Sequence, residues 1–159
     1  MIVVSDTSSI CYLILIDEVH LLPQLFEQII IPPRVRDELL APGSPEEVRA
    51  WMEEAPDWLK IQGARLVPTA VAVGLHAGER DVLALAIELP ADLVILDDGA
   101  ARRRAAELGL KFTGLLGVLD RAARRQRIHL RQAIWRLRKT NFRIHPALLH
   151  RLLVRHTDG

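Results

Sequence analysis

Short runs of β-branched and other apolar residues recur along the chain, and most of them are followed by a longer segment with helical periodicity. Runs of this kind are typical of strands that are buried on both faces, as in a parallel sheet. The expected strands are Met1–Ser5, Gln28–Ile31, Trp58–Ile61, Asp92–Leu96 and Leu110–Thr113. Because helical segments separate them, the sequence predicts an α/β fold in which a mostly parallel sheet lies between two layers of helices, the three-layer α/β/α sandwich.

The helical segments are indicated by apolar periodicity and by start and stop signals. They are expected over Cys11–Ile16, Leu21–Phe26, Arg34–Ala41, Pro45–Glu54, Arg80–Leu89, Gly99–Leu108, Leu115–Arg125, His129–Lys139 and Pro146–Arg155, with a short helix within Val67–His76. Hydroxyl side chains supply two of the expected N-caps, at residues 7–9 before the first helix and at Ser44 before the fourth.

Length and composition restrict the class of protein. The chain has 159 residues, half of them hydrophobic, which is enough for one ordinary domain with a core. The longest uninterrupted apolar run, Ile10–Ile16, is far shorter than the ~20 residues that span a bilayer, and no secretory signal is visible. A single cysteine, Cys11, excludes an internal disulfide and a cysteine-based zinc cluster. We therefore expect a cytoplasmic protein with no membrane association.

Charge is distributed unevenly between the two parts of the chain. Residues 1–100 contain 6 basic and 17 acidic side chains, a net charge of −11, whereas residues 101–159 contain 15 basic and 3 acidic ones, a net charge of +12. The acidic part could hold cations and the basic part a polyanion. A solvated helix surface explains the basic part equally well.

Acidic residues follow two of the expected strands. Asp6 comes directly after the first strand, and Asp97 and Asp98 come after the clearest central one. Working sites of parallel α/β folds lie beyond the carboxyl ends of the strands, so these side chains are expected to share a crevice. Each aspartate could also be a plain helix cap or turn residue.

Helical phase selects among the remaining carboxylates. Glu79 lies three and four positions before Val82 and Leu83, on the apolar face, whereas Asp81 lies about 200° away on the flank. Glu79 is therefore the better candidate for a site, although a carboxylate in the first helical turn also complements the helix dipole. The same reasoning favours Glu38 weakly over Asp37.

Several carboxylates gathered at one sheet edge repel one another unless cations lie between them. Hard oxygen ligands suit Mg²⁺ or Mn²⁺, and the scarcity of nearby histidine and cysteine argues against zinc. Divalent cations activate water and stabilise charge on phosphodiester oxygens, so this donor set is typical of metal-dependent phosphodiester hydrolysis.

Four segments, in order, resemble the successive motifs of PIN domains. They are Val4–Ile10 (VSDTSSI), Ile31–Leu39 (IPPRVRDEL), Ala77–Ala86 (AGERDVLALA) and Ile95–Arg102 (ILDDGAAR), and Ala106–Leu119 (AELGLKFTGLLGVL) is also similar. The chain most resembles the branch related to the VapC-like toxin nucleases of type II toxin–antitoxin pairs. The resemblance covers residues 1–142, the expected PIN-like nuclease domain, and residues 143–159 are expected to form a helical extension packed on it.

The resemblance implies a metal-dependent endoribonuclease with a sheet of about five parallel strands. It implies a catalytic quartet of Asp6, Glu38, Glu79 and Asp98, with Asp6, Glu79, Asp98 and Asp97 as ligands of Mg²⁺ or Mn²⁺. Supporting or substrate-contacting positions are Thr7, Ser8, Asp81 and Arg102. The implied partners are RNA, a small antitoxin protein and a second copy in a homodimer.

Two positions depart from the family pattern. Leu96 stands where many PIN domains carry a hydroxyl residue, and Gln126 stands where a glycine is common. In the basic part, Arg131, Trp135 and Arg138 form one stripe of a helix, which suits phosphates beside a stacked base. The alternative is that Trp135 is buried and the arginines form its solvated rim.

Two other functions remain open from the sequence. A PIN-like module without catalytic activity could bind RNA or protein through the basic part. An aspartyl-phosphate enzyme would use Asp6 as its nucleophile and would need a lysine, for which Lys60 and Lys111 are the candidates.

Overall fold

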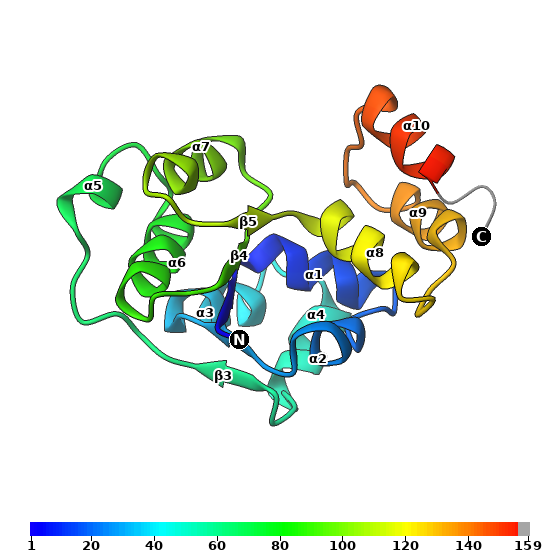
Figure 1. The fold of residues 1–159 in the computed structure, drawn as a ribbon. Helices are drawn as coiled ribbons and strands as arrows, with labels where there is room; N and C mark the ends of the chain where they lie inside the picture. Colours follow the sequence, from blue (N-terminus) through cyan, green and yellow to red (C-terminus); the bar gives the residue numbers. More distant parts are fainter. Residues whose placement is uncertain (156–159) are drawn as a thin grey trace.

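A five-stranded parallel sheet forms the centre of the computed structural model, which describes residues 1–155 (Figure 1). Its strands are β1 (Val3–Ser5), β2 (Ile29–Ile31), β3 (Leu59–Ile61), β4 (Leu93–Ile95) and β5 (Phe112–Thr113), in the spatial order β3-β2-β1-β4-β5. All pairings are parallel. The five expected strands and the predicted fold class are thereby confirmed.

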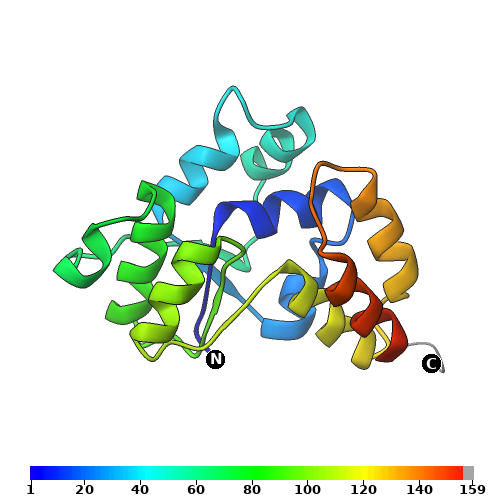
Figure 2. The same ribbon diagram turned by 90° about the horizontal axis from the view of Figure 1, so that it is seen from above.

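Helices occupy both faces of the sheet. They are α1 (Thr7–Leu15), α2 (Leu21–Phe26), α3 (Pro33–Leu40), α4 (Glu46–Glu53), α5 (Thr69–Ala72), α6 (Ala77–Glu88), α7 (Gly99–Glu107), α8 (Leu115–Arg124), α9 (Leu130–Arg138) and α10 (Pro146–Arg155). Helices α6 and α7 cover one face, and α1, α2 and α8 cover the other (Figure 2). Helix α3 packs against both α1 and α6, so it joins the two layers beside the strand ends.

The strand order reverses direction between β1 and β4. From β1 the chain proceeds outward through β2 to β3, then returns through α6 to β4 on the other side of β1. Right-handed crossovers place the helices of these two excursions on opposite faces. A crevice therefore opens at the carboxyl ends of β1 and β4, which pair directly through Ser5 and Ile95.

The C-terminal helices are anchored to the rest of the chain by specific contacts. Leu149 and Leu152 of α10 are buried, and Arg136 of α9 donates to the carbonyl oxygen of Ile16 and to Glu18 Oε1. The division of the chain into residues 1–142 and 143–159 stays a prediction. Residues 156–159 of the predicted extension lie outside the described part of the chain. No helix within residues 1–155 is long and apolar enough to cross a membrane.

Two predicted caps differ from the structure. Asp6, rather than a hydroxyl of residues 7–9, caps α1, since its Oδ1 accepts from the backbone N–H of Ser9 at 3.0 Å. Ser44 does not cap α4, which begins after Pro45 without a side-chain hydrogen bond. The carboxylate one residue earlier satisfies the start of α1, in agreement with the alternative interpretation of Asp6 as a helix cap.

Gln126, the position where the resemblance to PIN domains implies a glycine, has φ 58° in the turn after α8. This left-handed conformation is the one that glycine adopts without strain. A glycine would fit this turn without strain, and here the turn forms with a glutamine.

The corner between β5 and α8 leaves no room for a side chain at Gly114. A Cβ there would lie 2.7 Å from Asp97 Oδ1 and closer still to Arg102 Nη2. Because Arg102 is held by a hydrogen bond to the Leu96 carbonyl, it cannot retreat freely. We expect Gly114→Ala to lower the free energy of unfolding by about 1–3 kcal/mol in chemical denaturation.

Gly43→Ala is the matched control, because a Cβ there meets nothing within 4 Å. It should change the free energy of unfolding by less than about 1 kcal/mol. Equal effects of the two substitutions would show that the corner is looser than the structure indicates.

Candidate active site

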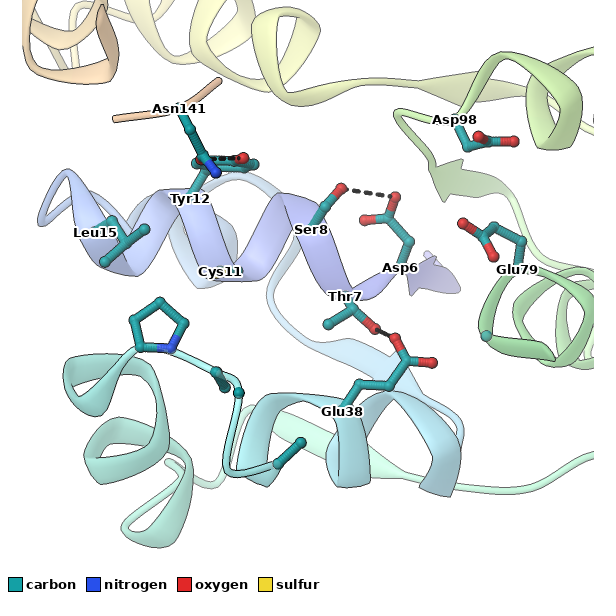
Figure 3. Close-up of a pocket in the computed structure, with 15 residues that line it drawn as sticks. Asp6, Thr7, Ser8, Cys11, Tyr12, Leu15, Glu38, Glu79, Asp98 and Asn141 are labelled. Carbon is teal, nitrogen blue, oxygen red and sulfur yellow. Dashed lines mark hydrogen bonds between the residues drawn. The ribbon is translucent and has the colours of Figure 1, made fainter. Parts of the chain in front are cut away.

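A pocket of about 570 Å³ opens at the carboxyl ends of β1 and β4. Its acidic end gathers side chains from four segments: the end of β1, α3, the start of α6 and the start of α7 (Figure 3). These side chains are Asp6, Glu38, Glu79 and Asp98. The structure thus brings together all four carboxylates of the predicted catalytic quartet.

Asp6 is the most buried of the four, with 6% of its surface exposed. Its Oδ1 accepts from the backbone N–H of Ser9, and its Oδ2 accepts from the backbone N–H of Asp97, each at 3.0 Å. Ser8 Oγ lies 3.4 Å from the same Oδ2. The carboxylate therefore ties α1 to the segment after β4 and still faces the pocket.

Burial dominates the electrostatics of Asp6. Desolvation, followed by repulsion from Asp97, raises the pKa of Asp6 from 3.8 to about 6, even though hydrogen bonds from Ser9 and Asp97 act in the opposite direction. The donors supplied by the protein do not fully compensate for burial of the charge. A bound cation would supply the missing compensation for the buried charge of Asp6.

Glu38 approaches the site from α3. Its Oε2 accepts a hydrogen bond from Thr7 Oγ1 at 2.7 Å, so the hydroxyl after Asp6 fixes the glutamate in place. A Cβ on Gly78 would lie 2.5 Å from Glu38 Oε1. A glycine at the start of α6 is therefore what lets Glu38 and Glu79 occupy neighbouring positions.

Helical phase distinguishes Glu79 from Asp81 as the sequence predicted. Glu79 lines the pocket and points toward Asp6 (Figure 3). Asp81 does not line it; its carboxylate is paired with Arg34 at 2.8 Å and with Arg80 at 3.4 Å. Asp81 is thus placed to hold α3 and α6 together through Arg34.

The two adjacent aspartates after β4 face different ways. Asp98 lines the acidic pocket and also caps α7, since its Oδ2 accepts from the backbone N–H of Ala101 at 2.9 Å. Asp97 instead accepts from Ser9 Oγ at 2.8 Å and from the backbone N–H of Leu115 at 3.0 Å. The Asp97 side chain was predicted as an extra metal ligand, but it does not line this pocket; only the backbone N–H of Asp97 supports Asp6.

Arg102 also lies behind the site. Its Nε donates to the Leu96 carbonyl at 2.7 Å, and its Nη2 lies 3.7 Å from Asp97 Oδ1. Together with Asp97 it lines a second pocket beside Phe112. Of its two predicted roles, support of the acidic residues agrees with this placement and contact with a substrate phosphate in the acidic pocket does not.

Three residues at the site were missed by sequence reasoning. Ser9 holds both Asp6 and Asp97, and its spacing of three residues from Asp6 is the usual one for a capped helix. Tyr12 Oη donates to Asn141 Oδ1 at 2.6 Å, and both side chains line the pocket (Figure 3). The last two are 129 positions apart, so no local pattern could pair them.

The donor set fits a hydrated divalent ion. All four carboxylates supply oxygen, the ligand type that Mg²⁺ and Mn²⁺ prefer, and no histidine lines the pocket among the described residues. Within residues 1–155, no three Asp, Glu, His or Cys side chains lie close enough to form a closed ligand set. An ion that keeps several of its waters suits such spaced carboxylates better than one wrapped entirely by protein.

The predicted basic stripe is present on α9. Arg131, Trp135 and Arg138 are all exposed, and Trp135 has 61% of its surface accessible. The alternative that Trp135 is buried is therefore wrong. Lys139 Nζ lies 3.5 Å from the centroid of the Trp135 ring, which adds a cation to the same surface.

The match to known families agrees with this geometry. A family model described as DUF3368, PIN domain, matches residues 2–158. The chain therefore belongs to the PIN-domain family, whose members are typically nucleases that use divalent metals. No curated protein matches the chain.

The raised pKa of Asp6 predicts a pH-dependent effect of Asp6→Asn on stability. In the metal-free native protein, ionisation of Asp6 opposes folding above pH 6, and this penalty disappears as the pH falls below 3.8. Two pKa units correspond to about 3 kcal/mol. The free energy of unfolding of Asp6→Asn minus that of the native protein should therefore fall by up to about 3 kcal/mol as the pH is lowered from 7.5 to 4.

Chemical denaturation in chelator at several pH values measures this difference. Asp57→Asn, which removes the charge of an exposed side chain, controls for the change in net charge. A difference between variant and native protein that stays constant with pH would contradict the account of Asp6.

Proposed function

We propose that this protein is a divalent-metal-dependent endoribonuclease that hydrolyses RNA phosphodiester bonds in the acidic pocket. The observation that carries the proposal is the meeting of Asp6, Glu38, Glu79 and Asp98 from four separate segments at the carboxyl edge of the sheet. Membership of the PIN-domain family supports the nuclease class.

In this proposal Asp6, Glu79 and Asp98 hold Mg²⁺ or Mn²⁺. A divalent ion bound by them would lower the pKa of a bound water and neutralise charge on the phosphate. Asp6 is kept in place by two backbone N–H groups, so its carboxylate is oriented before substrate arrives. Glu38, held by Thr7, is the carboxylate placed to accept a proton from the attacking water.

Glu79→Gln tests the site at the position where helical phase decides. Loss of the charge should lower metal-dependent RNA cleavage by about 100-fold or more, because a metal-binding oxygen or proton acceptor is removed. Cleavage of labelled RNA with Mg²⁺ or Mn²⁺, and with chelator, measures this. Cleavage that continues in the presence of chelator would contradict the metal-dependent mechanism.

Asp81→Asn is the matched control two residues away. It weakens the ion pairs with Arg34 and Arg80, at a cost of about 1 kcal/mol or less, and should leave cleavage nearly unchanged. A larger loss of cleavage for Asp81→Asn than for Glu79→Gln would show that Asp81, and not Glu79, belongs to the site.

The competing functions have weaker support. Neither Lys60 nor Lys111 lines the acidic pocket, so the lysine needed for aspartyl-phosphate chemistry is missing there within the described residues. A PIN-like binding module without catalytic activity would bind RNA yet leave it intact at every metal concentration, which the cleavage assay detects.

We further propose that this nuclease acts as the toxin of a toxin–antitoxin pair. The resemblance supports a toxin neutralised by a small antitoxin, and a homodimer in the cytoplasm. Induced expression of the native protein should then arrest growth of the host cells, and induced expression of Asp6→Asn should not. Continued growth with an active, accumulating nuclease would reject the toxin role and leave the nuclease intact.

The basic stripe of α9 is proposed as an RNA contact. Arg131 and Arg138 are exposed and form no ion pair within residues 1–155, whereas Arg136 on the same helix is paired with Glu18. Each phosphate contact with single-stranded RNA contributes about −0.7 to the log–log slope of affinity against salt. Replacing both Arg131 and Arg138 by Ala should therefore make the slope shallower by about 1.4.

Trp135→Ala should weaken binding by about 1–3 kcal/mol without changing the salt slope, since stacking releases no counterions. The titrations use Asp6→Asn as the background, so that RNA is not consumed. An unchanged slope after removal of both arginines would leave the stripe as solvated surface.

A further inference from the structure

The pocket at the strand ends has two parts with different chemistry. One is the acidic end described above. The other, here called the α1 arm, runs along α1 and is lined by Cys11, Tyr12, Leu15 and Asn141 (Figure 3). Pro45 also lines the pocket. The mechanism proposed for the acidic end makes no use of this arm.

The pocket is larger than metal chemistry requires. Six water molecules around an ion occupy about 180 Å³ at about 30 Å³ each. The pocket holds about 570 Å³, so most of its volume is available to a substrate group beside the ion.

The lining of the α1 arm selects the class of that group. No lysine or arginine belongs to the described lining of the pocket, so the arm is not built for a phosphate. It offers instead apolar surface, one aromatic ring and one amide. A nucleobase has the matching features, namely apolar faces and hydrogen-bonding edges.

Tyr12 and Asn141 are held in place before any ligand binds. Tyr12 Oη donates to Asn141 Oδ1, and the Tyr12 ring packs edge-on against Phe142 with centroids 5.0 Å apart. Because the amide oxygen is engaged, the exposed amide N–H₂ of Asn141 is left as the donor. Preorganised groups of this kind lose little conformational entropy on binding.

We propose that the α1 arm is a base-recognition site for the nucleotide next to the cleaved phosphate. The base stacks against Tyr12, and Asn141 Nδ2 donates to an acceptor on its edge, which favours bases that present an acceptor there. The inference rests on the proposed ribonuclease function, since it takes RNA to be the substrate, but it assigns a recognition role that cleavage alone does not require.

Binding of short RNA that lacks one base tests the proposal. A labelled single-stranded RNA and a series of copies with one abasic position each are titrated against Asp6→Asn protein in Mg²⁺. At one position, loss of the base should weaken binding by about 5- to 100-fold. The same position should show no penalty in protein that also carries Tyr12→Leu.

Matched variants separate stacking from edge recognition. Tyr12→Phe keeps the ring but releases the Asn141 amide, so it should keep the abasic penalty and lose discrimination among the four bases. Asn141→Ala should lose the same discrimination, whereas Gln132→Ala, an exposed amide on α9, should not. Thermal unfolding of each variant confirms that the fold is retained.

The outcomes for the two proposals are distinguishable. The base site is overturned if no position shows an abasic penalty, if Tyr12→Leu changes the penalty at none of the positions, or if RNA does not bind. Metal-dependent cleavage by the native protein is measured separately. Cleavage without base dependence would keep the nuclease and reject the base site, and base dependence without cleavage would do the reverse.

Discussion

Burial of the Asp6 carboxylate is the constraint on which the site depends. A buried charge needs donors, and Asp6 obtains them from the backbones of Ser9 in α1 and Asp97 after β4. These contacts lock β1 and β4 together at their carboxyl ends and place the first turns of α1 and α7 beside the pocket. Burial raises the pKa of Asp6 despite these donors, so they compensate for its charge only in part, and this supports the proposal of a cation at this position.

The parallel topology supplies two of the remaining carboxylates, whereas Glu38 comes from the last turn of α3. Helices that follow parallel strands begin at the carboxyl edge, so Glu79 in the first turn of α6 and Asp98 at the cap of α7 arrive at the same place. Positive helix N-termini favour these charges. A carboxylate can therefore be a helix cap or dipole partner and also a proposed metal ligand. The same arrangement stabilises the carboxylates and presents them to the pocket.

Local periodicity predicted the sheet, most of the helices and which of Glu79 and Asp81 lines the pocket, because strand burial and helical phase are read from neighbouring residues. The catalytic roles of Asp6 and Glu79 stay predictions. Local periodicity could not assign Asp97 and Asp98, since adjacent side chains diverge and the sequence does not say which one faces the crevice. The sequence could not decide between the two predicted roles of Arg102, because its main partner is a backbone carbonyl. The contact between Tyr12 and Asn141 depends on how α9 docks, which no local pattern contains.

The central claim is that Asp6, Glu79 and Asp98, carboxylates from three separate segments, form one metal-binding site. Crystals soaked in Mn²⁺ test it directly through anomalous scattering, without reference to any substrate. The account predicts a manganese peak in the pocket, within coordination distance of Asp6 and at least one of Glu79 and Asp98, that is lost in Asp6→Asn crystals. A well-ordered pocket with no peak at saturating Mn²⁺, or a peak that persists in the variant, would contradict it.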